Sequence, residues 1–245
     1  MTKINRTINL QLSGLHIREA EGEEKESRTI EGHAVVFGQR SVNLVPWSSY
    51  REVYEVMEPG SITQELINRS DVVLTAFHNN EMIFGRSVNG KGTLQLSIDQ
   101  KGVLVRCELA KTQAADDILE LIRRGDVCGM SFCYTADEDD NEHGVSYERT
   151  EEKGENGKEV WLRHVKQCNG LYDVTIAGHP AYQGTDVSNR EAGEAIERRI
   201  EAPIEDAKKR EAEDAAKKAE EEKKTRAAKL RVLQMNLMAD DLLED

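Results

Sequence analysis

The sequence contains few cysteines, and their spacing does not indicate a metal site or a disulfide framework. Its 245 residues include four cysteines, Cys107, Cys128, Cys133 and Cys168, and no two of them form a CxxC pair. Zinc sites usually contain closely spaced Cys or His pairs, and disulfides persist in oxidising compartments. The sequence therefore predicts free, buried thiols in a reducing compartment and no metal site.

Long apolar runs are absent as well. No stretch is long enough to span a bilayer, and the first residues, MTKINRTINLQLSG, lack the apolar core of a signal peptide. We therefore expect a protein of the cytoplasm that has no membrane partner.

Basic residues are neither abundant nor clustered. The chain has 33 basic and 46 acidic residues, a net charge of -13. From Arg190 onward there are 13 basic and 16 acidic residues, which leaves 20 and 30, a net of -10, for residues 1–189. Nucleic-acid surfaces need clustered Lys and Arg to displace counterions from phosphates. This acidic region therefore argues against a nucleic-acid partner.

The most informative stretch is KTQAADDILELIRRGDVCGMSFCYT, residues 111–135. Thr112 can cap a helix, apolar residues then recur with helical spacing, and Gly125 can take the left-handed conformation that ends it. The period then changes to two. Met130, Phe132 and Tyr134 fall on one face of a strand, and Ser131 falls on the other face with small neighbours. The pattern predicts a helix followed by a strand that carries a serine.

The rest of residues 1–188 reads as short strands with few helices. Alternating patterns and turn residues predict further strands at 4–15, 29–37, 51–57, 71–78, 93–99, 103–109, 159–167 and 171–177, a short helix at 61–69, and a mobile loop or irregular hairpin at 136–158. The strand at 71–78 is expected to end in a turn at Asn79-Asn80. Many short strands favour a mainly β (α+β) domain built as a barrel.

Residues 189–245 differ in composition. They are rich in Glu, Lys and Ala, which is typical of solvated helices or coiled coils, and Leu230, Leu233 and Leu237 form a narrow apolar stripe. Such a helix would be marginal by itself but stable with a partner helix. We expect a charged helical or partly disordered arm that can associate with another chain, including a second copy of this one.

Three polar residues on predicted strands, His78, Ser131 and Asp173, have the types needed for nucleophilic acyl transfer. A serine is a poor nucleophile until a base takes its proton, a histidine suits that role near neutral pH, and a third group orients the imidazole. Their spacing in the sequence does not establish a triad, because triads occur in several chain orders. The GxSxG and HExxH motifs are absent, which leaves those hydrolase classes without support.

Four segments, taken in order, resemble the prohead serine proteases of tailed bacteriophages, whose fold is related to the herpesvirus assembly protease. The resemblance covers roughly residues 30–188. The segments are GHAVVFG with EVYEVMEPGSI, LTAFHNNEMIFGR, IRRGDVCGMSFCY and LYDVTIAGHPAYQGT.

The resemblance implies a fold and a site. It implies a herpesvirus-protease-like β-barrel in which His78 is the base, Ser131 the nucleophile and Asp173 the third member. His179 and, more distantly, His164 are alternatives for that third place. The donor that stabilises the oxyanion is left open between backbone N–H groups near Gly178 and the side chain of Arg86.

The resemblance also implies a function that needs no cofactor. It implies a serine endopeptidase packaged inside the assembling prohead in the host cytoplasm. Its substrates would be the scaffold, or the scaffolding extension of the major capsid protein, and the protease itself. The alternative is a non-catalytic assembly protein on the same fold, in which the three polar residues are ordinary strand residues.

Overall fold

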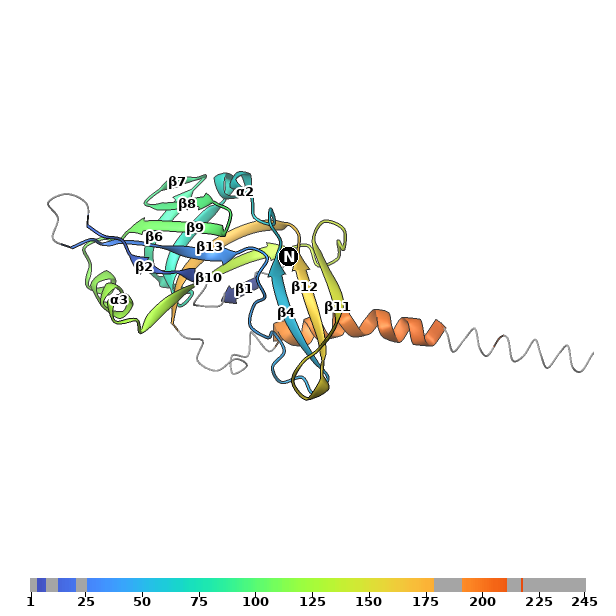
Figure 1. Cartoon of the computed structure of the whole chain (residues 1–245). Helices are drawn as coiled ribbons and strands as arrows, with labels where there is room; N and C mark the ends of the chain where they lie inside the picture. Colours follow the sequence, from blue (N-terminus) through green and yellow to red (C-terminus); the bar gives the residue numbers. More distant parts are fainter. Residues whose placement is uncertain (1–3, 8–12, 21–25, 179–190, 211–216, 218–245) are drawn as a thin grey trace, which may run out of the picture. The chain divides into compact units, whose positions relative to one another are not determined.

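The described part of the chain is mostly β-strand with few helices (Figure 1). The fold is that of a computed structural model, which describes residues 4–7, 13–20, 26–178, 191–210 and 217. The expected mainly β, α+β class is confirmed. The predicted barrel is not confirmed, because the described strands pair into three open sheets and none closes on itself.

The largest sheet has six strands in the order β1-β10-β13-β5-β6-β7. They are β1 (Ile4–Thr7), β10 (Val127–Ala136), β13 (Cys168–Gly178), β5 (Asp71–Ala76), β6 (Asn79–Val88) and β7 (Lys91–Gly92). β13 runs antiparallel to β10 and parallel to β5, so β5 and β13 residues that are 100 positions apart in sequence lie side by side. The three predicted site residues belong to this sheet or to a turn that joins its strands.

The other sheets have four and three strands. The first contains β2 (His16–Ile17), β3 (Thr29–Val36), β9 (Gly102–Glu108) and β8 (Leu94–Ile98) in that order. The second contains β11 (Val145–Lys153), β12 (Glu159–Val165) and β4 (Arg51–Met57). β11 falls where we expected a loop or irregular hairpin. It is an edge strand with mostly exposed or half-exposed side chains, so its charged residues do not prevent strand pairing.

The helix before the serine-bearing strand forms as predicted. It is α3 (Gln113–Arg124), which begins where the Thr112 hydroxyl accepts a bond from the Ala115 N–H and ends at Gly125 with a φ of 78°. Ala115, Ile118, Leu119 and Ile122 are its buried side chains. The remaining short helices include α2 (Gln64–Arg69), capped by Thr63, and the 3-10 turn η1 (Glu155–Gly157).

The hydrophobic core lies on one face of the large sheet. Met130, Phe132 and Tyr134 alternate along β10 and are fully or almost fully buried, as are Leu74 on β5 and Val174 on β13. Ser131 and Cys133 project from the opposite face of β10, because successive residues of a strand point to opposite sides. The sheet therefore separates an apolar face from a face that can carry chemistry.

Residues 191–210 are helical, and the charged C-terminal arm at 189–245 stays a prediction. The chain divides into two compact units, residues 1–193 and 194–245. The boundary that we predicted, between residues 188 and 189, and the leucine stripe at 230–237 lie outside the described residues, so the domain limits and the association role stay predictions. No helix in the described ranges is long and apolar enough to cross a membrane.

The four cysteines are free thiols in the structure, and the predicted burial is confirmed for three of them but is wrong for Cys128. Cys107, Cys133 and Cys168 are buried and Cys128 is partly exposed. Burial raises the pKa of Cys107 to about 11 and also raises that of Cys168, so both stay protonated near neutral pH.

Iodoacetamide at pH 8 should therefore alkylate Cys128 first in the folded protein, because the other three thiols are buried. Peptide mass mapping of the labelled protein measures this. Equal labelling of all four cysteines without denaturant would contradict this burial pattern.

Candidate active site

Ser131 projects from the middle of β10 on the face opposite the core. Its backbone partner on β13 is Thr175, whose partner on β5 is Thr75. Directly paired residues place their side chains on the same face, so one row of hydroxyl groups crosses three strands. Asp173, two residues before Thr175, pairs with Cys133 and faces the same side. Strand pairing alone therefore brings the serine and the carboxylate to one face.

His78 lies in the turn between β5 and β6, not in the strand where we predicted it. Phe77 and His78 form a two-residue connection, and Ala76 pairs with Asn79 across it. Both turn residues have positive φ, 56° and 55°, which is the requirement of a type I′ hairpin turn. The predicted turn at Asn79-Asn80 is thus wrong by two residues, since both asparagines belong to β6.

This turn determines which way His78 points. On a continuing strand, His78 would lie on the same face as Ala76, which is the buried core face. The turn instead carries the imidazole to the face of Ser131 and Asp173. Positive φ is unfavourable for phenylalanine and histidine, so the surrounding contacts must stabilise the turn.

The three side chains form one hydrogen-bonded row. The Nε2 atom of His78 lies 2.8 Å from Ser131 Oγ, and its Nδ1 atom lies 2.9 Å from Asp173 Oδ1. With a proton on Nδ1, the ring donates to the carboxylate and offers Nε2 as the acceptor for the serine hydroxyl. The arrangement can deprotonate Ser131 while Asp173 fixes the tautomer and stabilises the imidazolium that forms.

Thr175 holds the histidine turn in place. Its Oγ1 accepts a hydrogen bond of 3.0 Å from the backbone N–H of His78, and it also lies 2.8 Å from the Oγ1 of Thr75. Both threonines are fully buried. The N–H of Phe77 donates to the backbone carbonyl of Ile176 at 3.0 Å, so both residues of the strained turn are attached to β13. Neither Thr75 nor Thr175 was predicted from the sequence. The signal available for Thr175 is that it lies two residues after Asp173 on the same predicted strand, and therefore on the same face.

Replacement of Thr175 with valine is expected to weaken this attachment. Valine keeps the branched shape but cannot accept the bond from the His78 N–H, and a buried donor that loses its partner costs about 1–3 kcal/mol. We expect lower thermal stability and a loss of roughly tenfold or more in the acyl-transfer activity that the site can support, because the imidazole is held less firmly. Thr175→Ser, which keeps the hydroxyl, is the matched control. Equal loss in both variants would contradict a positioning role for the hydroxyl.

The serine is much less exposed than the histidine. Ser131 is 1% exposed, whereas the His78 and Asp173 side chains are 23% and 13% exposed. The site is thus shielded from water on the serine side, which strengthens electrostatic interactions inside it. A substrate carbonyl group has to reach Ser131, and at this exposure the serine hydroxyl is not accessible to it.

Two other residues considered from the sequence, Arg86 and His164, lie away from this site. Arg86 binds Asp71 through two bonds, one of them the 2.7 Å bond from Nε, and the pair is exposed. His164 lies between Glu58 and Glu148, with Nδ1 2.6 Å from the Glu58 carboxylate, so it is not part of the row with Ser131. His179 lies outside the described residues. Within the described part of the chain, no group of three or more His, Cys, Asp or Glu side chains could hold a metal ion.

Comparison with known proteins gives one match. Residues 13–199 match the model of a protein family described as the caudovirus prohead serine protease. Neither the curated proteins nor the solved structures contain a significant match. The matched region includes the three hydrogen-bonded side chains and begins after β1.

Proposed function

This chain belongs to the caudovirus prohead serine protease family, and we propose that it is the endopeptidase that cleaves capsid and scaffold proteins within its own prohead. The family places the protein in phage capsid maturation and inside the assembling prohead of the host cell. The observation that carries the proposal is the continuous hydrogen bonding from Ser131 through His78 to Asp173. A serine side chain needs such a neighbouring base to act as a nucleophile.

In the proposed mechanism Ser131 Oγ attacks the carbonyl carbon of the scissile peptide bond. His78 Nε2 takes the hydroxyl proton and then transfers it to the leaving amine, so that the C–N bond breaks and an acyl-enzyme remains. Water, deprotonated by the same imidazole, then attacks the ester and returns the hydroxyl to Ser131. Asp173 accepts the Nδ1–H bond throughout and stabilises the positive charge on the ring. These reaction steps need no cofactor.

The proposed substrates are proteins that surround the enzyme in the prohead. They are the scaffold or the scaffolding extension of the major capsid protein, and the protease chain itself. A peptide must enter the site in an extended form, so exposed and weakly packed segments are the ones most readily cleaved. The charged segment at 189–245 has the composition of such a weakly packed segment, and we propose it as a self-cleavage target and as the part that docks to scaffold or shell.

The proposal can be tested by mass spectrometry. The purified chain is incubated alone and with the major capsid protein of the same phage, and intact masses are followed over time. We expect defined fragments of the capsid protein with wild-type enzyme and intact protein with Ser131→Ala, which removes one oxygen from a strand residue. Identical fragmentation by both proteins would reject the proposal. Absence of cleavage by both, with normal shell assembly, would favour a non-catalytic assembly protein.

A further inference from the structure

The strand that carries Ser131 has the chain's own N-terminal segment along one edge. β1 pairs antiparallel with β10, and the four pairs are Ile4↔Tyr134, Asn5↔Cys133, Arg6↔Phe132 and Thr7↔Ser131. β1 is the outermost strand of the sheet on this side. The backbone edge immediately beside the serine is therefore occupied by residues 4–7.

The segment that occupies this edge is not part of the region shared with the family. The family match begins at residue 13, after β1 has ended. Among the residues whose burial the structure describes, Leu15 is the first member of the buried core, and Ile4 is a partly buried residue packed against it. The strand that carries the proposed nucleophile thus lies within the family match, whereas the neighbouring β1 lies outside it.

The opposite edge of β10 is already paired with a central strand of the sheet. That strand is β13, and the Ser131 hydroxyl is bonded to the imidazole of His78. With Ser131 at 1% exposure, a substrate can reach it only if something moves. Four residues paired through their backbone at a sheet edge are easier to displace than a central strand, because edge segments open locally at low cost.

We infer that the edge of β10 beside Ser131 is the binding surface for the substrate main chain, and that residues 4–7 occupy it as an intramolecular competitor. This inference rests on the proposed endopeptidase function. An extended peptide that replaces β1 would pair with residues 131–134 as an added strand. Such pairing recognises the main chain of any extended segment, whereas pockets for alternate side chains would select the sequence. The ligand class is thus an unfolded or loop segment of a scaffold or capsid protein.

Two variants test the inference, one lacking residues 1–12 and one full-length chain with Arg6→Pro, which disrupts strand pairing at β1. The substrate is the major capsid protein, and KM and kcat are measured separately. We expect KM to fall by about tenfold with kcat unchanged, because four cross-strand pairs together contribute roughly one decade in an equilibrium constant. A synthetic peptide of residues 1–12 should raise the KM of both variants again, whereas a shuffled peptide should not.

A binding measurement separates this inference from the proposed function. The fluorescent peptide of residues 1–12 is titrated into the truncated chain with Ser131→Ala, which cannot hydrolyse it. We expect saturable binding that the capsid protein displaces, and about tenfold weaker binding to the full-length Ser131→Ala chain. Absence of binding, or an unchanged KM in the Arg6→Pro variant, overturns the inference even when the wild-type enzyme is active. If the peptide binds but the wild-type protein hydrolyses no capsid protein, the proposed endopeptidase function is overturned. The inference that residues 4–7 and the capsid segment bind the same edge of β10 then still holds.

Discussion

Ser131→Ala and His78→Ala are each expected to lower kcat by about 10⁶-fold, and the double variant should be no slower than either single variant. In the proposed mechanism Ser131 Oγ and His78 Nε2, which are 2.8 Å apart, exchange the proton and therefore act as one unit. Once either partner is gone, the other has no reaction to assist. Single-turnover cleavage of the capsid protein, with each variant at equal concentration, measures this. Losses that multiply in the double variant would mean that the two residues act in separate steps.

Asp173→Asn extends the same experiment to the third position. The amide keeps the size of the carboxylate but stabilises the wrong tautomer of His78, and we expect kcat to fall by about 10⁴-fold. The bond between Asp173 Oδ1 and His78 Nδ1 is 2.9 Å long, so a direct effect is expected. His179→Asn is the matched control, since His179 is the alternative for this role. A large loss in His179→Asn with little loss in Asp173→Asn would assign the third position to His179.

The helix and strand that precede and carry the serine could be predicted because their signals are local. Thr112, the one-face apolar spacing and Gly125 define α3, and the alternation from Met130 to Tyr134 places Ser131 opposite the core. These features depend on hydrogen bonds and burial within a few residues of sequence. The same is true of β8 and β9, which form within about one residue of the strands predicted at 93–99 and 103–109 and pair with each other.

The histidine turn could not be predicted, because its cause is not local. The sequence around it offers Asn79-Asn80, which favours a turn by itself, whereas the structure uses Phe77 and His78 in left-handed conformations. What stabilises this choice is Thr175 and the Ile176 carbonyl, about one hundred residues later in the chain. A departure from local preference of this kind is most common at functional sites.

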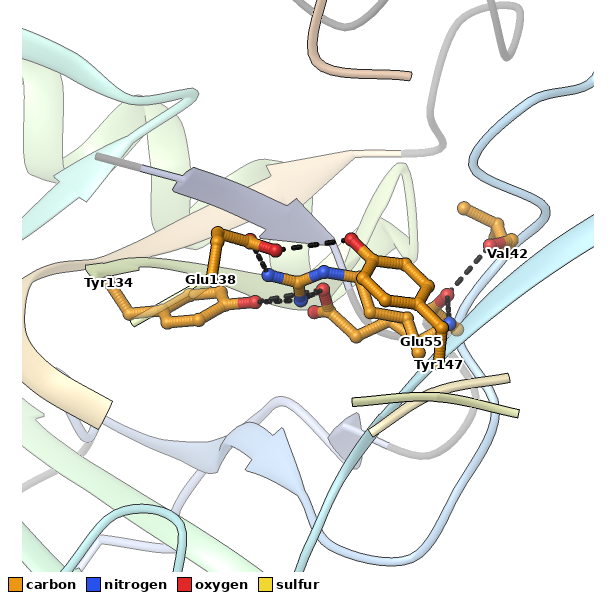
Figure 2. A network of polar contacts seen from close by, with 7 residues as sticks. Val42, Glu55, Tyr134, Glu138 and Tyr147 are labelled. Atoms are coloured by element: carbon orange, nitrogen blue, oxygen red, sulfur yellow. Dashed lines mark hydrogen bonds and ion pairs between the residues drawn. The ribbon is translucent and has the colours of Figure 1, made fainter. Parts of the chain in front are cut away.

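A buried charge network between two sheets should have the largest effect on stability. Arg163 on β12 is completely buried and pairs across the three-stranded sheet with Glu55 on β4 and Tyr147 on β11. Figure 2 shows that the side chains of Glu55 and Tyr147 lie close to those of Tyr134 and Glu138. Tyr134 belongs to β10, and Glu138 belongs to the segment after it. The guanidinium binds the carboxylates of Glu55 and Glu138 and donates to the Tyr134 hydroxyl at 2.8 Å.

The charges in this network stabilise one another strongly. Burial lowers the pKa of Arg163, but Tyr134, Glu55 and Glu138 raise it well above its usual value, so the residue stays charged. Glu55 is 2% exposed and also accepts a 2.8 Å bond from the Tyr134 hydroxyl. Since Tyr134 stacks on Phe132 in the core of the large sheet, the network connects that core to the three-stranded sheet.

Arg163→Met is therefore expected to destabilise the domain by about 3–5 kcal/mol, because it leaves buried carboxylate charge without the cation that balances it. Unfolding in guanidinium chloride, followed by circular dichroism, measures the change. We expect a lower midpoint concentration of denaturant and an unchanged dependence of the unfolding free energy on denaturant concentration. Arg149→Met is the matched control. Arg149 forms an exposed pair with Glu159 between β11 and β12, and its loss should cost less than about 1 kcal/mol. Similar midpoints for the two variants would contradict the assignment.

The double variant Arg163→Met with Glu55→Leu distinguishes the cost of an unbalanced charge from the cost of a lost contact. Replacing both members of a buried ion pair with apolar side chains of similar volume is often neutral or stabilising, whereas removing one member is strongly destabilising. We therefore expect the double variant to be more stable than Arg163→Met alone. If the two losses simply add, the network acts through packing rather than charge. If the double variant recovers stability, the buried charge must have another reason to be there, and fixing how the three-stranded sheet packs on β10 is the role that its geometry supports.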